Sequence, residues 1–227
     1  GRPVNLQVGL GVRPVATSRD FGMGSFERTD QPLDIAISGR GFLNVRHSPE
    51  GAAVEVIAYT KDGALQAMPA PGGDGTLMLV TNQGLPILDV DGDPIIFEDW
   101  VHVPDLRISQ EGLISHRDPE DIEAPVINIA QLAISQFPNI QGLEAVGNNL
   151  FLQTGASGAP IMEIEAMEGP VEVTSPSTIV QGVLEMSNVN VANEMVNLIT
   201  TQRAYELNAR AISTSDQMLQ EAVNLRR

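Results

Sequence analysis

Residues 183–225 read VLEMSNVNVANEMVNLITTQRAYELNARAISTSDQMLQEAVNL, and this stretch decides the fold of the C-terminal part of the chain. From Asn190 onward it contains no proline or glycine, and one line of side chains recurs at alternating steps of four and three residues. Most members of this line, called the seam below, are apolar, as in the heptad pattern of a coiled coil. We therefore expect one long α-helix, about 50 Å in length, that must pack against another helix. The seam consists of Val191, Met195, Leu198, Gln202, Tyr205, Ala209, Ile212, Asp216, Leu219 and Val223.

The predicted helix begins at a capping residue. Asn190 is a favoured N-cap because its side-chain oxygen can accept hydrogen bonds from free N–H groups of the first turn. Glu194 places a carboxylate in that turn, near the positive end of the helix dipole. Two polar residues, Gln202 and Asp216, interrupt the seam. They either lie at its edge in water or fix the register against a partner helix at some cost in stability.

The remainder of the chain has a different pattern, in which short β-like runs are broken by Gly, Asp, Asn and Pro. Asp62-Gly63, Asp91-Gly92 and Glu111-Gly112 are turn signals between such runs. We therefore predict a mainly β fold: an antiparallel all-β domain over residues 1–185, followed by the helix over 186–227. The expected strands are Leu6–Thr17, Asp34–Val45, Val54–Thr60, Thr76–Thr81, Ile95–Phe97, Leu106–Ser109, Leu113–His116, Val126–Ser135 and Leu150–Thr154, and the expected loops include Met68–Gly75 and Asp118–Pro125.

The charge of the chain is unevenly placed. The formal net charge is −16, from 29 acidic and 13 basic residues. Four of each lie from Asn190 onward, so 25 acidic and 9 basic residues remain before the helix. A neutral helix suits close packing between identical copies, whereas an acidic β region suits a solvated exterior. This balance disfavours binding to nucleic acids and to anionic membranes.

The residue patterns that carry catalysis are missing. His47, His102 and His116 are scattered and fit no metal-binding spacing, and the chain has no cysteine for disulfides or thiolate sites. Residues 154–158 (TGASG) superficially resemble a nucleophile elbow, but position 159 is alanine and no helix pattern follows. Four carboxylates alternate with apolar residues, as on the solvent face of a strand, and nothing singles out a catalytic pair. They are Glu163, Glu165, Glu168 and Glu172.

Two further patterns suggest ligands only at first sight. Gly39 and Gly41 lack the third glycine of a dinucleotide fingerprint, so a bulge or a close backbone contact explains them better. Asp89–Asp93 (DVDGD) looks like a calcium loop, but the glycine required at its sixth position would fall on Pro94 and the bidentate glutamate on Trp100. An Asp-Gly hairpin turn is the preferred interpretation. We therefore predict no catalytic residue, no cofactor and no bound metal.

The C-terminal stretch resembles the signature of the flagellar axial proteins, which comprise rod, hook and hook-associated subunits. The matching runs are Leu184-Glu185, Ser187–Asn190, Glu194–Ile199, Gln202–Glu206 with Asn208, Ile212–Thr214 and Asp216–Leu219. Upstream runs follow in the same order: Gly9–Thr17, Leu33–Ile37, Gly39 with Gly41-Phe42, Tyr59–Gly63, Phe137–Asn139, Gly142-Leu143, Gly147 with Asn149–Phe151, and Ser157–Pro160. The chain is most similar to the distal rod proteins, since hook proteins usually have Asp at the position of Asn190.

This resemblance implies a structural subunit without an active site. Such subunits polymerise helically into the hollow shaft that transmits torque from the flagellar motor to the hook. Their terminal helices would line the central channel, and the β domain would turn inside the ring bushings. The implied partners are other copies, other rod and hook proteins and the bushing proteins. The family implies export by the flagellar type III system and a rod that spans the periplasm, without insertion into a membrane.

One departure concerns the family's N-terminal helix, which this sequence does not contain. The chain starts at Gly1 and goes directly into Val4–Ala16, so we expect the usual partner of the seam to lie outside it.

Two alternatives stay open. One is a hook or proximal rod subunit. The other is a secreted β-domain adhesin or enzyme with a coiled-coil oligomerisation tail, which would need a pocket of convergent polar groups.

Overall fold

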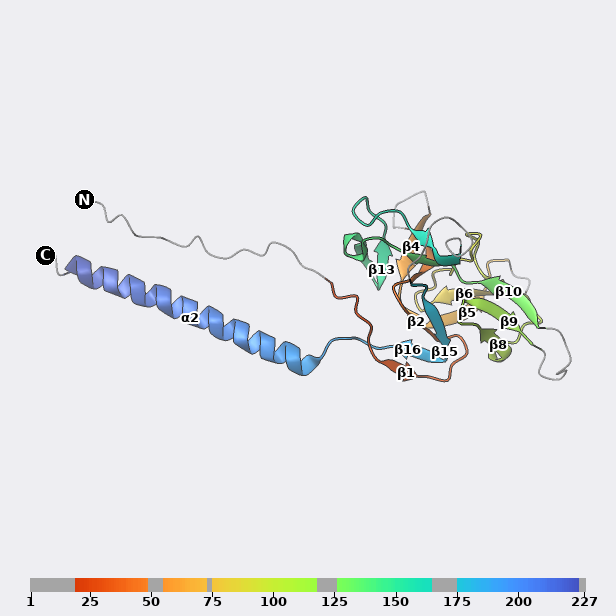
Figure 1. Cartoon of the computed structure of the whole chain (residues 1–227), viewed down its shortest axis with the longest axis horizontal. Coiled ribbons are helices and arrows are strands. Elements are labelled where there is room, and N and C mark those ends of the chain that lie inside the picture. Colours follow the sequence, from red (N-terminus) through yellow and green to blue (C-terminus); the bar gives the residue numbers. More distant parts are fainter. Residues whose placement is uncertain (1–18, 49–54, 73–74, 118–125, 165–174, 225–227) are drawn as a thin grey trace. The chain divides into compact units, whose positions relative to one another are not determined.

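The computed structural model describes residues 19–48, 55–72, 75–117, 126–164 and 175–224. The chain divides into two compact units, Gly1–Met186 and Ser187–Arg227. The first, called the β unit below, contains the strands, and the second contains the helix α2 (Val191–Asn224) (Figure 1). The predicted class, mainly β with one long C-terminal helix, is confirmed.

The β unit is built from short strands, all paired antiparallel. They are β1 (Phe26–Arg28), β2 (Ile35–Ser38), β3 (Phe42–His47), β4 (Val56–Thr60), β5 (Leu65–Pro69), β6 (Leu77–Thr81), β7 (Ile96–Phe97), β8 (Leu106–Ile108), β9 (Leu113–His116), β10 (Ile127–Gln131), β11 (Ile134–Gln136), β12 (Glu144–Gly147), β13 (Leu150–Leu152), β14 (Ile161–Met162), β15 (Thr178–Gln181) and β16 (Val183–Glu185). Two short 3-10 helices, Val103–Asp105 and Ile140–Gly142, connect β7 to β8 and β11 to β12, which follow each other in the sequence.

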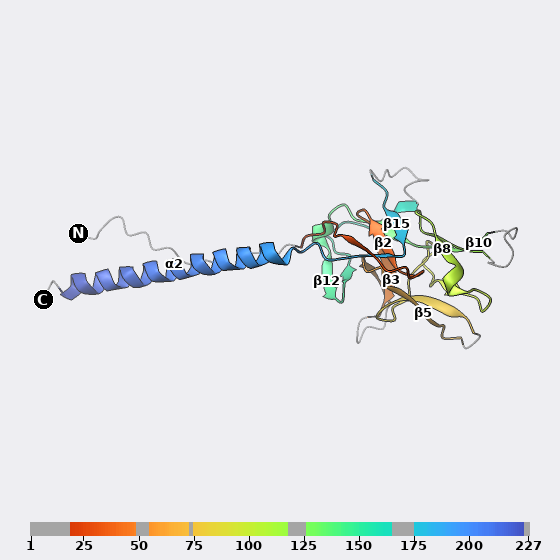
Figure 2. The same ribbon diagram turned by 90° about the horizontal axis from the view of Figure 1, so that it is seen from below.

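These strands form several small sheets, which can be followed in Figures 1 and 2. The largest has the order β12-β13-β4-β3-β11-β14, and two others have the orders β5-β6-β7 and β10-β9-β8. The pairs β15-β2 and β1-β16 complete the set. Aliphatic side chains from most of the sheets share one core, which includes Ile37, Val45, Leu79, Ile114 and Ile179. Phe42, Tyr59, Phe137 and Leu143 form a second, mainly aromatic cluster.

Strand β2 lies where close backbone contacts require glycine. The Ile35 N–H donates a hydrogen bond of 3.0 Å to the Gly63 carbonyl. A Cβ on Gly63 would lie only 1.7 Å from the Ile35 carbonyl oxygen, so no larger residue fits there without moving the backbone. After β2, Gly39 has a φ of +147°, and a Cβ there would lie 2.6 Å from Ser177 Oγ. The close contact expected for Gly39 is therefore confirmed.

The chain enters and leaves the β unit at the same place. Strand β1 pairs with β16, and the Met186 N–H donates to the Ser25 carbonyl at 2.8 Å. The Gly24 N–H donates to Glu185 Oε1 at 2.9 Å. Residues 24–25 therefore lie beside residues 185–186, just as β1 lies beside β16 in Figure 1.

Several predicted strand boundaries were wrong. The run Asp34–Val45 is two strands, because the chain turns between β2 and β3 at the positive φ of Gly39. Val126–Ser135 is likewise divided into β10 and β11, since Leu132 leaves the ladder to bridge Asp89. Met68 and Pro69, expected in a loop, end β5. The predicted segments Leu6–Thr17 and Asp118–Pro125 lie outside the described residues. The strands not predicted are β1, β5, β12, β14, β15 and β16.

The contact between Gly63 and Ile35 yields a stability prediction. Gly63→Ala should lower the unfolding free energy by about 3 kcal/mol, because the new methyl group collides with the Ile35 carbonyl and forces β2 away from residue 63. Gly155→Ala is the matched control, since nothing lies within 4 Å of a Cβ at that position. Urea unfolding followed by circular dichroism measures both. Equal stability of the two variants would contradict the close packing at Gly63.

Candidate assembly surface

Helix α2 begins with a formed cap. Asn190 lies directly before it, and Asn190 Oδ1 accepts hydrogen bonds from the Ala192 N–H at 3.1 Å and the Asn193 N–H at 3.3 Å. The Glu194 N–H donates to the Asn190 carbonyl at 3.0 Å, which closes the first helical turn. The carboxylate of Glu194 lies in this turn, where the helix dipole favours negative charge. The helix then continues for 34 residues, about 50 Å, without interruption.

The seam lies on the surface of α2. Its large apolar members, Val191, Met195, Leu198, Tyr205, Ile212 and Leu219, are between 56% and 76% exposed. Ala209 and the two polar members, Gln202 and Asp216, are exposed as well. The side chain of Val223 is outside the described part of the structure. Within this chain the described seam residues are therefore open to a partner along the length of the helix.

A second apolar stripe, which the heptad analysis missed, runs along α2. It consists of Val196, Leu207 and Met218, which are 59%, 64% and 61% exposed. They are spaced by eleven residues, and eleven residues make almost three whole turns at about 3.6 residues per turn, so they lie on one line. Leu207 follows Tyr205 by two residues, which places the stripe about 200° around the helix from the seam. Helix α2 thus presents apolar side chains on two nearly opposite sides.

The acidic turn Asp89–Asp93 is organised by its own hydrogen bonds. The Asp89 N–H donates to the Asp93 carbonyl at 2.8 Å, and the Gly92 N–H donates to the Asp89 carbonyl at 2.9 Å. Asp89 Oδ1 accepts from the N–H groups of Val90 at 2.6 Å and Gln131 at 3.0 Å, so this carboxylate holds the turn against β10. Among the described residues, no group of three or more potential ligands could hold a metal ion.

Other residues considered for chemistry have structural contacts. Ser157 is fully buried, and its hydroxyl donates to the Thr154 carbonyl at 2.8 Å. His116 is buried beside Trp100, with ring centroids 5.5 Å apart. His47 ends β3, and His102 directly precedes the 3-10 helix Val103–Asp105.

The prediction that Glu163 faces solvent was wrong. Its side chain is buried, and hydrogen bonds satisfy both carboxylate oxygens. Glu163 Oε1 accepts from Gln136 Nε2 at 2.8 Å, and Glu163 Oε2 accepts from the Ser177 N–H at 2.7 Å. Ser177 Oγ in turn accepts from the Gly41 N–H at 2.8 Å. The carboxylate therefore connects three segments of the β unit. Glu165, Glu168 and Glu172 lie outside the described residues.

Known proteins similar to this chain are flagellar. Residues 180–225 match the family model described as "Flagellar basal body rod FlgEFG protein C-terminal". The flagellar basal-body rod protein FlgG of Buchnera aphidicola subsp. Acyrthosiphon pisum is 41% identical over 223 residues, 98% of this chain and 76% of that protein. FlgG of Borreliella burgdorferi is 40% identical over 226 residues, 100% of this chain and 77% of that protein. The flagellar hook-basal body complex protein FlhP of Bacillus subtilis is 32% identical over 218 residues, 96% of this chain and 73% of that protein.

The similarity extends from the capped helix through the β unit. The chain therefore belongs to the family of flagellar basal-body rod proteins. Within the described residues, no helix combines the length and apolar character that crossing a bilayer requires.

The hydrogen bonds of the acidic turn predict that it serves structure and not calcium binding. Asp89→Ala should cost about 1–2 kcal/mol of stability, because it leaves the Gln131 N–H without its acceptor. Asp91→Ala, at the exposed part of the same turn, should have little effect. Urea unfolding measures both variants, and calorimetric titration with calcium chloride should give no stoichiometric binding. Micromolar binding that Asp91→Ala abolishes would contradict this assignment.

Proposed function

We propose that this chain is a structural subunit of the distal rod of the flagellar basal body. Copies polymerise helically into a hollow shaft that transmits torque from the motor to the hook. The single observation that carries this proposal is the exposed apolar seam along α2, in a chain that belongs to the rod family. Such a seam needs another helix to cover it, and in the proposed rod that helix is the family's N-terminal helix or the helix of a neighbouring copy.

The energetics of α2 favour assembly. Each large apolar side chain that becomes buried contributes roughly 1.5–3 kcal/mol, before the cost of ordering the partners is subtracted. The second stripe, Val196, Leu207 and Met218, supports contacts on two sides, as for a helix packed between neighbours in a tube. Because acidic and basic residues balance from Asn190 onward, identical helices can approach without net repulsion. In the rod these helices form the inner tube around the export channel.

The β unit forms the outer layer of the rod. It carries the acidic excess of the chain, which keeps its surface hydrated. Its partners are neighbouring copies, the other rod and hook proteins and the ring bushings inside which the rod turns. The protein reaches this position in the periplasm-spanning rod through the flagellar type III export system.

A catalytic or adhesive β unit is the less favoured function. One recess of about 480 Å³ on the β unit is lined partly by Glu163, Ser177 and Gln131. The Ser177 N–H and a Glu163 carboxylate oxygen are hydrogen-bonded to each other, so these groups do not converge on a ligand. The recess therefore does not provide the set of free polar groups that an active site needs.

The first test separates assembly from folding. Leu198→Asp should abolish rod formation, because every subunit then carries a charge in a buried seam. Leu207→Asp should weaken assembly through the second stripe. Asn197→Asp is the matched control: it adds the same carboxylate about 100° around the helix from Leu198, away from both stripes. Each full-length variant is expressed in cells, and the rods are counted in electron micrographs of the isolated basal bodies. Normal rods with Leu198→Asp would contradict the role of the seam.

A truncation tests whether the β unit is independent of α2. Removal of residues 190–227 should leave a cooperative β-type melting transition, because α2 supplies no residue of the described core clusters. The same truncation should prevent rod formation in cells. A truncated protein that fails to fold would place the helix in the core of the β unit. Rods built from truncated subunits would refute the inner-tube role.

The subtype predicts the mechanics of the polymer. A distal rod subunit should form straight, stiff filaments, whereas a hook subunit forms filaments that bend. Electron micrographs of filaments assembled from the full-length protein give the persistence length of the filaments. Supercoiled or readily bent filaments would favour the hook assignment.

A further inference from the structure

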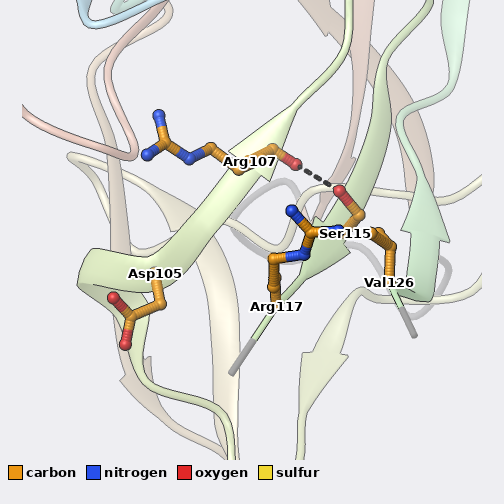
Figure 3. A pocket seen from close by; sticks show the side chains of 5 residues that line it. All are labelled: Asp105, Arg107, Ser115, Arg117 and Val126. Atoms are coloured by element: carbon orange, nitrogen blue, oxygen red, sulfur yellow. Dashed lines mark hydrogen bonds between the residues drawn. The ribbon is translucent and has the colours of Figure 1, made fainter. Parts of the chain in front are cut away.

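The outer face of the β8-β9-β10 sheet carries a small basic recess. Leu106 pairs with His116, and Ile108 pairs with Ile114, and these four side chains are buried on the inner face. The intervening pair, Arg107 and Ser115, therefore lies on the outer face. A recess of about 300 Å³ opens there, with the side chains shown in Figure 3. It is lined by Asp105, Arg107, Ser115, Arg117 and Val126.

The positive charge of the recess comes from two arginines. Arg107 and Arg117 are exposed, and neither guanidinium forms an ion pair within the described residues. By contrast, Arg28 pairs with Asp30, Arg46 pairs with Glu55, and Lys61 donates to the Gly39 carbonyl at 3.0 Å. Ser115 Oγ donates to the Arg107 carbonyl at 3.3 Å, and this hydrogen bond connects the two strands that line the recess, β8 and β9 (Figure 3). Asp105 offsets one of the two positive charges, so the lining keeps a net charge of +1.

The acidic turn Asp89–Asp93 carries the opposite charge on the same β unit. Asp91, Gly92 and Asp93 are exposed, and nothing lies within 4 Å of a Cβ built on Gly92, so the tip stands in open space. Neither Asp91 nor Asp93 forms an ion pair within the part of the chain that the structure describes. Arg46 Nη2 donates to the Gly92 carbonyl at 3.1 Å, and the Leu88–Pro94 bridge closes the base of the turn. The tip is therefore held in shape before it meets a partner.

The recess and the turn lie at opposite ends of strand β10. Val126, in the lining, precedes the first residue of the strand, whereas the Val90 N–H donates to the carbonyl of Gln131, its last residue. The five steps between Val126 and Gln131 span about 17 Å at roughly 3.4 Å per residue. An ion pair requires an N–O distance below about 4 Å, so a carboxylate at one end suits a guanidinium of another copy better than one of its own.

We propose that the Asp91–Asp93 tip of one copy docks into the Arg107–Arg117 recess of the next. The contact joins two different surfaces of the same chain, so it is heterologous, the type of contact that builds an open helical polymer when its rotation does not close into a ring. It rests on the proposed function, because it describes one lateral contact within the polymer. Val126, which is 50% exposed, supplies apolar contact beside the charges, and the paired charges fix the orientation of neighbouring β units.

Charge reversal tests this pairing. The full-length gene is replaced in cells by variants carrying Arg107→Glu with Arg117→Glu, or Asp91→Arg with Asp93→Arg, or all four changes. Each double reversal places like charges in contact and should reduce the number of rods about tenfold or more. The fourfold variant should restore them, since it exchanges the two signs. Co-expression of the two double variants should also restore rods, because their surfaces complement each other alternately.

Controls separate the recess from general charge effects. Arg19→Glu with Arg40→Glu makes the same change in net charge at two other exposed arginines and should leave rod numbers unchanged. The melting temperatures of the purified variants should equal that of the parent chain. Equal loss of rods with this control, or no rescue in the fourfold variant, would overturn the pairing. So would a lower melting temperature of the recess variant, because the arginines would then serve their own subunit. If rods persist in every charge variant but vanish with Leu198→Asp, the lateral contact fails while the proposed function stands.

Discussion

The pairing of β2 with β15 holds the two ends of the β unit together. Ile37 pairs with Ile179 across most of the length of the chain, and both side chains are buried in the shared core. Three segments depend on this contact: Gly63 packs on Ile35, Gly39 packs on Ser177, and the Ile179 N–H donates to the Gln110 carbonyl at 2.9 Å. The residues between β2 and β15 must become compact before these two strands can meet. The small sheets therefore stabilise one another, and local β propensity alone does not determine them.

This dependence explains which parts of the fold could be predicted from the sequence. The helix was predicted because its periodicity is local and is repeated over many turns. Strands such as β15 and β1 were missed, since three or four residues carry little pattern and their partners are remote. The division of Asp34–Val45 depended on the φ of Gly39, which responds to Ser177 far along the chain. The turn at Asp91-Gly92 could be predicted because an Asp-Gly pair favours a tight turn whatever surrounds it.

For the candidate surfaces too, local periodic patterns could be predicted, and contacts between distant residues could not. The line of the seam followed from spacing, because residues that recur at steps of four and three share one face of a helix. Every side chain of α2 that the structure describes is exposed, so the burial of the seam by a partner stays a prediction. The stripe through Val196, Leu207 and Met218 was missed, since a search in steps of seven passes over a spacing of eleven. Sequence alternation also misplaced Glu163, because its partners Gln136 and Ser177 come from distant segments of the chain. The basic recess could not be predicted, since only the register of β8 with β9 places Arg107 near Arg117.

The antiparallel contact of β1 with β16 has an evolutionary consequence. Since residues 24–25 and 185–186 meet, residues 26–184 form one excursion between two neighbouring points of the chain. A domain inserted in this way can grow, shrink or be exchanged while the segments on either side keep their course. In the proposed rod, one polymerising helix can then carry outer domains of different size and character, each adapted to a different setting along the same shaft.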